Sequence, residues 1–177
     1  LSQIQKILDK LNQNTDNLEK ELERTLELFK QLQYEFKLDQ AINEIKEQVA
    51  EQKSLLEKTE ELEKKSETSK DKGAEKDQEK AGLEKDSDSK NSENQELAKQ
   101  QEKLSEEFEK TSQKIEELEK LGEELDQESD LPSDEDVNDV QDQQKESEEM
   151  LKQNSPSKAK SPQKNALQKM QKMQQQM

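Results

Sequence analysis

Hydrophobic residues recur at alternating intervals of three and four over the first part of the chain. From Leu1 to Phe36 these positions hold Leu, Ile or Phe, apart from Thr15 and Thr25, and the spacing persists for about five heptads. Intervals of three and four are typical of the a and d positions of a coiled coil. The pattern slips by about one residue after Phe36 and then resumes. It predicts one long amphipathic helix over residues 1–65.

A second set of heptad positions predicts another helix over residues 92–128. It begins at Ser92, where the run Ser-Glu-Asn-Gln fits a capping box. Residues 66–91 between the two helices are rich in Lys, Glu, Asp and Ser and hold one large apolar residue, Leu83. Such a segment buries too little apolar surface to offset its chain entropy, so we predict a disordered charged linker there. The two helices then form a helical hairpin, or each pairs with another chain.

The residues at the a and d positions of these two predicted helices form two apolar seams. We expect their side chains to carry the interactions of the chain. Two polar residues, Gln52 and Gln101, also occupy positions of this heptad spacing. Three of the four aromatic residues of the chain lie close together, at Phe29, Tyr34 and Phe36. They either pack together within the seam or form a patch that docks a partner. The interaction seam comprises Leu18, Leu22, Phe29, Leu32, Phe36, Leu97, Leu104, Phe108, Ile115, Leu118 and Leu125.

The last third of the chain predicts two shorter helices. Ser133 is a candidate N-cap followed by three acidic residues, which favour a helix N-terminus, so we expect a short acidic helix over residues 133–154. Residues 155–162 are expected to form a Ser/Pro linker. Ser-Pro at its end suits an N-cap and a first helical position, so a basic, Met-containing helix should start over residues 163–177.

Composition narrows the class of protein. Hydrophobic residues are 25% of the 177 residues and charged residues 42%, which excludes a large globular core but suits coiled-coil seams. The net charge of −16 argues against nucleic acid as a partner. No stretch approaches the roughly 18 apolar residues of a membrane span. The pattern is already under way at Leu1 and still running at Met177, which indicates a piece of a longer protein.

Candidate chemistry is sparse. The chain has no His and no Cys, which removes the usual nucleophile, base and zinc-ligand types. Its many acidic residues fall mostly outside the seams and should be solvated, whereas a catalytic pair of carboxylates needs burial or a close charged neighbour. The run from Asp134 to Asp139 resembles the start of a calcium loop but has neither the Gly nor the terminal Glu of one. We therefore expect no enzyme activity and assign no catalytic, cofactor-binding or metal-binding residues.

One stretch carries a resemblance to a known family. The run Asn-Leu-Glu-Lys-Glu-Leu-Glu-Arg-Thr-Leu-Glu-Leu-Phe-Lys-Gln-Leu at residues 17–32 is followed by a Gln/Glu/Lys helix to Thr59. It resembles the helical region of large membrane-anchored Bacteroidota proteins classed as domain of unknown function 4175. The resemblance implies a parent protein with N-terminal transmembrane helices and extracytoplasmic β-domains, and a periplasmic location. No catalytic residues are assigned to that region of the family.

The sequence therefore predicts an all-α, elongated fold of coiled-coil-like helices with a disordered charged linker. The favoured function is a non-enzymatic helical spacer or self-association segment of a larger envelope protein. Its partner would be protein, bound by coiled-coil packing to a second copy or another chain. A regulatory partner-binding module and a largely disordered, solvating tether are the alternatives.

Overall fold

The computed structural model describes residues 2–71, 83–127 and 130–177, and the side chains of residues 3–65, 91–127 and 130–177. These residues form four α-helices and no strand within the described ranges, which confirms the all-α, elongated fold. The helices are α1 (Ser2–Asp71), α2 (Leu83–Glu124), α3 (Asp134–Lys152) and α4 (Pro156–Gln176).

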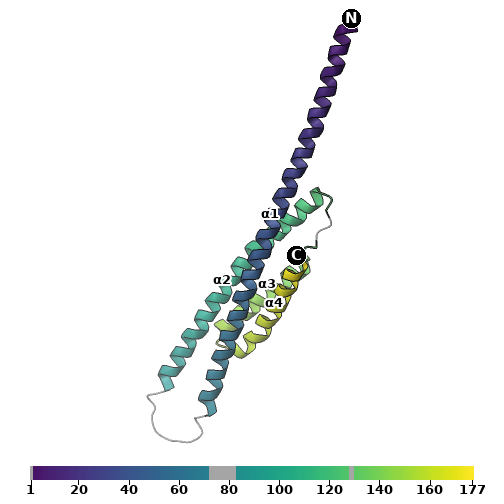
Figure 1. Cartoon of the computed structure of the whole chain (residues 1–177). Helices are drawn as coiled ribbons and strands as arrows, with labels where there is room; N and C mark the ends of the chain where they lie inside the picture. The colour runs from purple at the N-terminus through teal and green to yellow at the C-terminus, as the bar shows by residue number, and fades with distance from the viewer. Residues whose placement is uncertain (1, 72–82, 128–129) are drawn as a thin grey trace.

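The four helices form an antiparallel bundle in which each helix runs opposite to the one before it (Figure 1). Contacts join α1 to α2, α2 to α3, α3 to α4, and α4 back to α1. The hairpin of α1 and α2 is thus present, and α3 and α4 complete it as a bundle. Residues 66–71 and 83–91, where we expected linker, have helical backbone, and the remainder of that segment lies outside the described residues.

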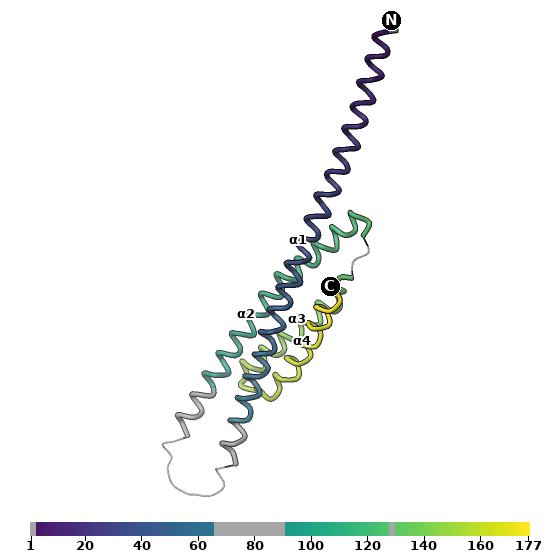
Figure 2. Tube along the Cα trace, in the orientation of Figure 1, coloured from purple at the N-terminus to yellow at the C-terminus, as the bar shows by residue number. Residues whose placement is uncertain are grey.

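Helix α1 is far longer than the bundle. Its 70 residues span roughly 105 Å at 1.5 Å per residue, whereas α3 and α4 have 19 and 21 residues. The part of α1 before Lys30, which pairs with Glu124 at the end of α2, therefore projects beyond the other helices as a single straight rod (Figures 1 and 2). We call residues 3–36 the arm; its last two turns still lie beside α2.

Both turns that lead out of helices α2 and α3 are Schellman motifs. Asp126 and Asn154 adopt positive φ angles of 49° and 55°. After each, the next amide donates to a carbonyl five residues back: Gln127 to Gly122 at 3.0 Å, and Ser155 to Met150 at 2.9 Å. These bonds satisfy carbonyls that a helix end otherwise leaves without donors.

The start of α4 corrects the prediction of a Ser/Pro linker at 155–162. The Schellman turn at Asn154 places Ser155 at the N-cap and Pro156 at the first helical position, so Pro162 lies inside the helix. The capping box expected at Ser92 is likewise wrong, because α2 is already helical from Leu83. In α3, by contrast, the Ser133 Oγ accepts from the Asp136 amide at 3.2 Å, as an N-cap should.

The core consists of three apolar clusters stacked along the bundle axis. The largest joins all four helices and includes Ile45, Phe108, Val140 and Met170, each 0% exposed. A second cluster around Leu55, Leu104 and Leu151 lies nearer the C-terminal end of α1. The third contains Tyr34, Ala41 and Leu118 at the end from which the arm emerges.

Candidate interaction surface

The arm carries the largest exposed apolar surface of the described residues. Eleven large hydrophobic side chains lie 53–75% exposed, and all of them belong to α1 before residue 37. Exposed apolar surface of this extent usually marks a site of interaction with another molecule. The side chains are Ile4, Ile7, Leu8, Leu11, Leu18, Leu22, Leu26, Leu28, Phe29, Leu32 and Phe36.

This apolar stripe lies on the side of α1 opposite to the bundle. Phe36 is two residues from both Tyr34 and Leu38, and at about 100° per residue each pair lies roughly 160° apart on the helix. Tyr34 and Leu38 pack against α2 in the third cluster, whereas Phe36 is 62% exposed. The slip in the heptad pattern after Phe36 is therefore a change of face. One continuous helix presents one apolar seam to its own bundle and another to the outside.

The bundle-facing positions become polar when they are followed into the arm. Counting back from Tyr34 in steps of three and four, they hold Gln31, Glu27, Arg24, Lys20, Asn17, Gln13, Lys10 and Lys6. This side of the arm is polar and faces solvent. Of the described helices, only the end of α2 lies beside it. The sequence of the arm thus encodes a helix whose single apolar face is turned away from the bundle.

Ion pairs and Tyr34 fix the arm where it leaves the bundle. Lys30 Nζ lies 2.6 Å from Glu124 Oε2, and Lys37 Nζ lies 2.6 Å from Glu117 Oε2, so both pairs join α1 to α2. The hydrogen bond from Lys37 holds the pKa of Glu117 below its usual value. Tyr34, 7% exposed, packs on Leu118 between them. Tyr34 is therefore occupied within the bundle, whereas the exposed Phe29 and Phe36 are free to contact a partner.

The polar members of the arm seam are compatible with burial. Thr15 Oγ1 donates to the Leu11 carbonyl at 2.9 Å, and Thr25 Oγ1 donates to the Glu21 carbonyl at 2.7 Å. Their hydroxyl protons therefore need no acceptor from a partner, and burying them leaves no donor unpaired. The whole stripe can be covered by an apolar surface.

The predicted seam residues divide into two groups. Those on α2 pack within the bundle: Leu97, Leu104, Phe108, Ile115 and Leu118 are at most 6% exposed, and Leu125 is partly buried in the third cluster. Those on the arm, Leu18, Leu22, Phe29, Leu32 and Phe36, are 62–75% exposed. The α2 residues thus hold this fold together, whereas the arm residues are available to another molecule.

A buried layer of four glutamines crosses the bundle, one from each helix. Gln52, Gln101, Gln144 and Gln163 are all 0% exposed. The Gln101 Oε1 accepts from Gln52 Nε2 at 3.2 Å, Gln163 Nε2 at 3.4 Å and Ser147 Oγ at 3.2 Å. Gln52 Oε1 accepts in turn from Gln101 and Gln144, at 3.1 and 3.3 Å.

Such a layer fixes the register of the helices, because any axial shift of one helix would place amides against apolar clusters. The sequence signal for it was the placement of Gln52 and Gln101 on the heptad seams, and Gln144 follows Val137 and Val140 at the same spacing in α3. Gln163 was missed because the start of α4 was misplaced. The layer is a structural feature of the bundle rather than a site that faces solvent.

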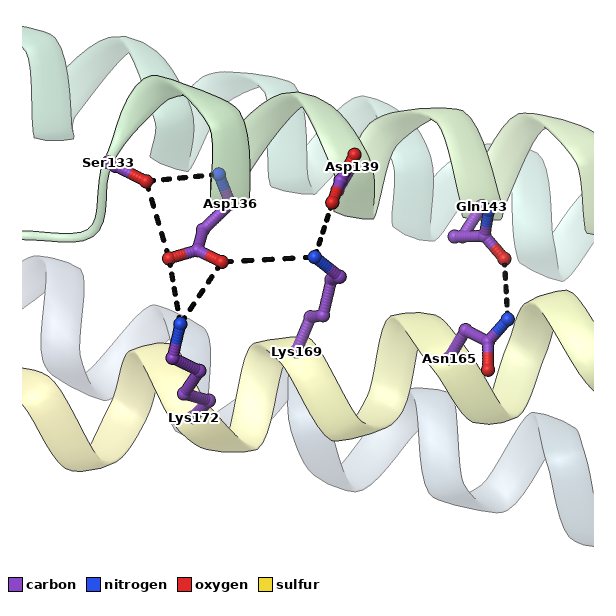
Figure 3. A network of polar contacts seen from close by, with 7 residues as sticks. All are labelled: Ser133, Asp136, Asp139, Gln143, Asn165, Lys169 and Lys172. Atoms are coloured by element: carbon purple, nitrogen blue, oxygen red, sulfur yellow. Dashed lines mark hydrogen bonds and ion pairs between the residues drawn. The ribbon is translucent and has the colours of Figure 1, made fainter.

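Opposite charges join α3 to α4 along their outer edge (Figure 3). Lys169 pairs with Asp139, and Lys172 Nζ lies 3.1 Å from Asp136 Oδ2. The hydrogen bond from Lys172 lowers the pKa of Asp136 against the opposing effect of its partial burial. The bond to Asp139 raises the pKa of Lys169. Neighbouring acidic and basic segments therefore attract each other within this chain.

The surface grooves of the bundle are lined by solvated charges. The groove between α1 and α2 has acidic side chains of α1 on one side, and on the other both basic and acidic side chains of α2: Lys110, Lys114, Glu107 and Glu117. Within the described side chains, no three acidic groups converge so as to hold a metal ion. No helix of the described ranges has an apolar stretch long enough to cross a membrane.

Comparison of the chain with protein-family models, curated proteins and solved structures found no match. The case for function rests on the geometry of the arm and the bundle.

Proposed function

We propose that this chain is a non-enzymatic structural and interaction module. The four-helix bundle is its base, and the arm is a helical spacer that docks protein by coiled-coil packing. The observation that carries this proposal is the stripe of eleven exposed apolar side chains on the face of α1 opposite to the bundle. An apolar stripe with heptad spacing is complementary to another helix of the same period.

The arm is suited to act as a spacer because it belongs to a helix that the bundle anchors. Between Tyr34 and Leu62, eight side chains of α1 are buried in the bundle, and the same helix continues without interruption to Ser2. The arm therefore holds its seam at a fixed direction over a reach of roughly 50 Å. A flexible tether of the same length would not fix that direction.

The proposed setting is a larger envelope protein with a membrane-anchored, periplasmic parent. The resemblance to the Bacteroidota family supports it, and the run at 17–32 that carries the resemblance lies wholly on the arm. The proposed partner is protein rather than nucleic acid, because the chain carries a net charge of −16.

A regulatory partner-binding module is the second candidate. It is favoured by the exposure of two aromatic side chains, Phe29 and Phe36, beside the point where the arm meets the bundle. Aromatic anchors of this kind dominate many interfaces. A regulatory partner would dock at this junction alone, so that Phe36→Ala would abolish its binding while Leu8→Ala would leave it intact. A spacer that docks along its length would lose affinity with either substitution.

The test of the spacer is a distance measurement within one chain. Because the chain has no Cys, spin labels can be placed at Gln13→Cys and Lys46→Cys, two exposed positions on the arm and on the bundle part of α1. Dilution with unlabelled chain removes distances between copies. The proposal predicts one narrow distribution near 50 Å, the length of 33 helical residues. A broad distribution centred well below that value would refute it.

A further inference from the structure

We propose that the arm binds a second copy of this chain, and that the two arms pair antiparallel. The inference rests on the proposed function, because it names the partner of the same seam. It follows from the spacing of the seam residues, from their capacity for burial and from the low net charge of the arm.

The arm seam is complementary to itself when reversed. In an antiparallel pair centred on Lys20, each a position of one copy meets a d position of the other. Large residues then meet large residues, and the two threonines meet each other. The pairs are Ile4 with Phe36, Leu8 with Leu32, Leu11 with Phe29, Thr15 with Thr25, and Leu18 with Leu22.

The apolar area on one arm is sufficient for a stable dimer. Eleven side chains that are more than half exposed offer on the order of 50–100 Å² each, or roughly 550–1,100 Å² per arm. A standard protein interface buries about 800 Å² per partner. Thr15 and Thr25 add no penalty, because their hydroxyls are bonded within their own helix.

The charge of the arm permits self-association, in contrast to that of the rest of the chain. Residues 2–36 hold five basic and seven acidic side chains, a net charge of −2, so the remaining residues carry −14 of the total −16. Two copies can thus meet through their arms with little repulsion, whereas their bundles repel each other. An antiparallel pair places the two bundles at opposite ends, far beyond the Debye length of about 10 Å at moderate salt.

A parallel pair would oppose like charges. In that alignment the outer face of α1 beyond Phe36 would meet its own copy. Of its six exposed heptad positions up to residue 57, four are charged, Asp39, Lys46, Lys53 and Glu57, and two are uncharged, Asn43 and Ala50. Each of these residues would lie against the same residue of the second copy. The antiparallel pair avoids these contacts, because the residues beyond Phe36 of one copy lie past Ile4 of the other.

The first experiment measures mass over a wide range of protein concentration by analytical ultracentrifugation. The proposal predicts two chains per particle at high concentration, and at least a roughly 100-fold weaker association for Leu22→Lys. Leu8→Lys is a second variant at the other end of the seam. Glu27→Gln is the matched control, since it makes the same change in charge on the opposite side of the arm. A mass of one chain, or of more than two, at all accessible concentrations would overturn the proposal.

The second experiment determines the orientation with single-cysteine variants, mixed in pairs and treated with a short thiol cross-linker. Gln5→Cys and Gln33→Cys lie on the same flank of the antiparallel pair, so this mixture should give a cross-linked dimer. Asn14→Cys and Glu19→Cys are neighbours only in a parallel pair. Cross-linking of the second mixture and not the first would refute the antiparallel arrangement.

The two proposals fail in distinguishable ways. A narrow spin-label distance together with a monomeric mass would remove the second copy as the partner and leave the spacer standing. A dimer with a broad distance distribution would remove the rigid spacer.

Discussion

Truncation of Phe108 to Ala should destabilise the bundle more than almost any other single substitution. Phe108 is 0% exposed and lies in a cluster to which all four helices contribute, through Ile45, Val140 and Met170 among others. Replacing a fully buried Phe by Ala costs about 3–5 kcal/mol, because the transfer energy is lost and a cavity remains. A small domain has only about 5–15 kcal/mol of stability in total, so the loss is a large fraction of it.

The chain contains its own reporter for this measurement. It has one Tyr and no Trp, and Tyr34 is buried between α1 and α2. Urea unfolding followed by tyrosine fluorescence therefore reports on the bundle, and the variant should lose about 3–5 kcal/mol of unfolding free energy.

Phe29→Ala provides the matched control, because it makes the same chemical change at a side chain that is 63% exposed. At a concentration where the chain is monomeric, its effect should stay within about 0.5 kcal/mol. Equal losses for Phe108→Ala and Phe29→Ala would refute the division of α1 and α2 into a packed bundle and an unpartnered arm.

Three further predictions concern the polar and backbone features of the bundle. Gln101→Leu should lower the unfolding free energy, measured in urea, by about 2–4 kcal/mol, because three donors lose their acceptor. Replacing all four layer glutamines by Leu should lower it by less than this single change. A larger loss for the fourfold variant would contradict the reasoning. Pro162→Ala should raise the thermal midpoint, because it removes a proline from inside α4. The net gain in unfolding free energy should be about 1–2 kcal/mol once the lost packing of the proline ring is subtracted. A lower midpoint would contradict this. The pKa of Asp136 is lowered in the folded chain, so its contribution to stability is present above the unfolded pKa of about 3.9 and is lost as the pH falls through the folded value. The stability difference between wild type and Asp136→Asn should accordingly shrink between pH 6 and pH 2, and a constant difference in urea midpoint would contradict this.

The sequence predicted helices well where apolar residues keep strict spacing. Leu97, Leu104 and Phe108 identified the packed face of α2 because burial of that face is what stabilises the helix. The turn at Asn154 was not predicted, because a non-glycine residue at positive φ has only a weak local signal. The start of α4 was misplaced as a consequence.

The sequence could not reveal which seam meets which neighbour. The slip after Phe36 was visible, but heptad spacing carries no information about whether a face packs on its own chain or on another. Helices α3 and α4 were also hard to assign to the bundle, because Gln144, Ser147 and Gln163 occupy core positions and weaken the apolar stripes. Only their hydrogen bonds, from Ser147 and Gln163 to Gln101 and from Gln144 to Gln52, show how polar side chains can lie at the centre of the fold.

Amide hydrogen exchange along α1 tests the central claim most directly. At a concentration where the chain is monomeric, amides near Ile45 and Leu55 should be strongly protected. Those between Leu8 and Leu26 should exchange faster, because brief local openings of an unpacked helix cost little free energy even when the helix is mostly formed. Raising the concentration should protect the arm and leave the bundle unchanged. Equal protection of both halves of α1 at every concentration would contradict the account, since the arm would then have no need of a partner.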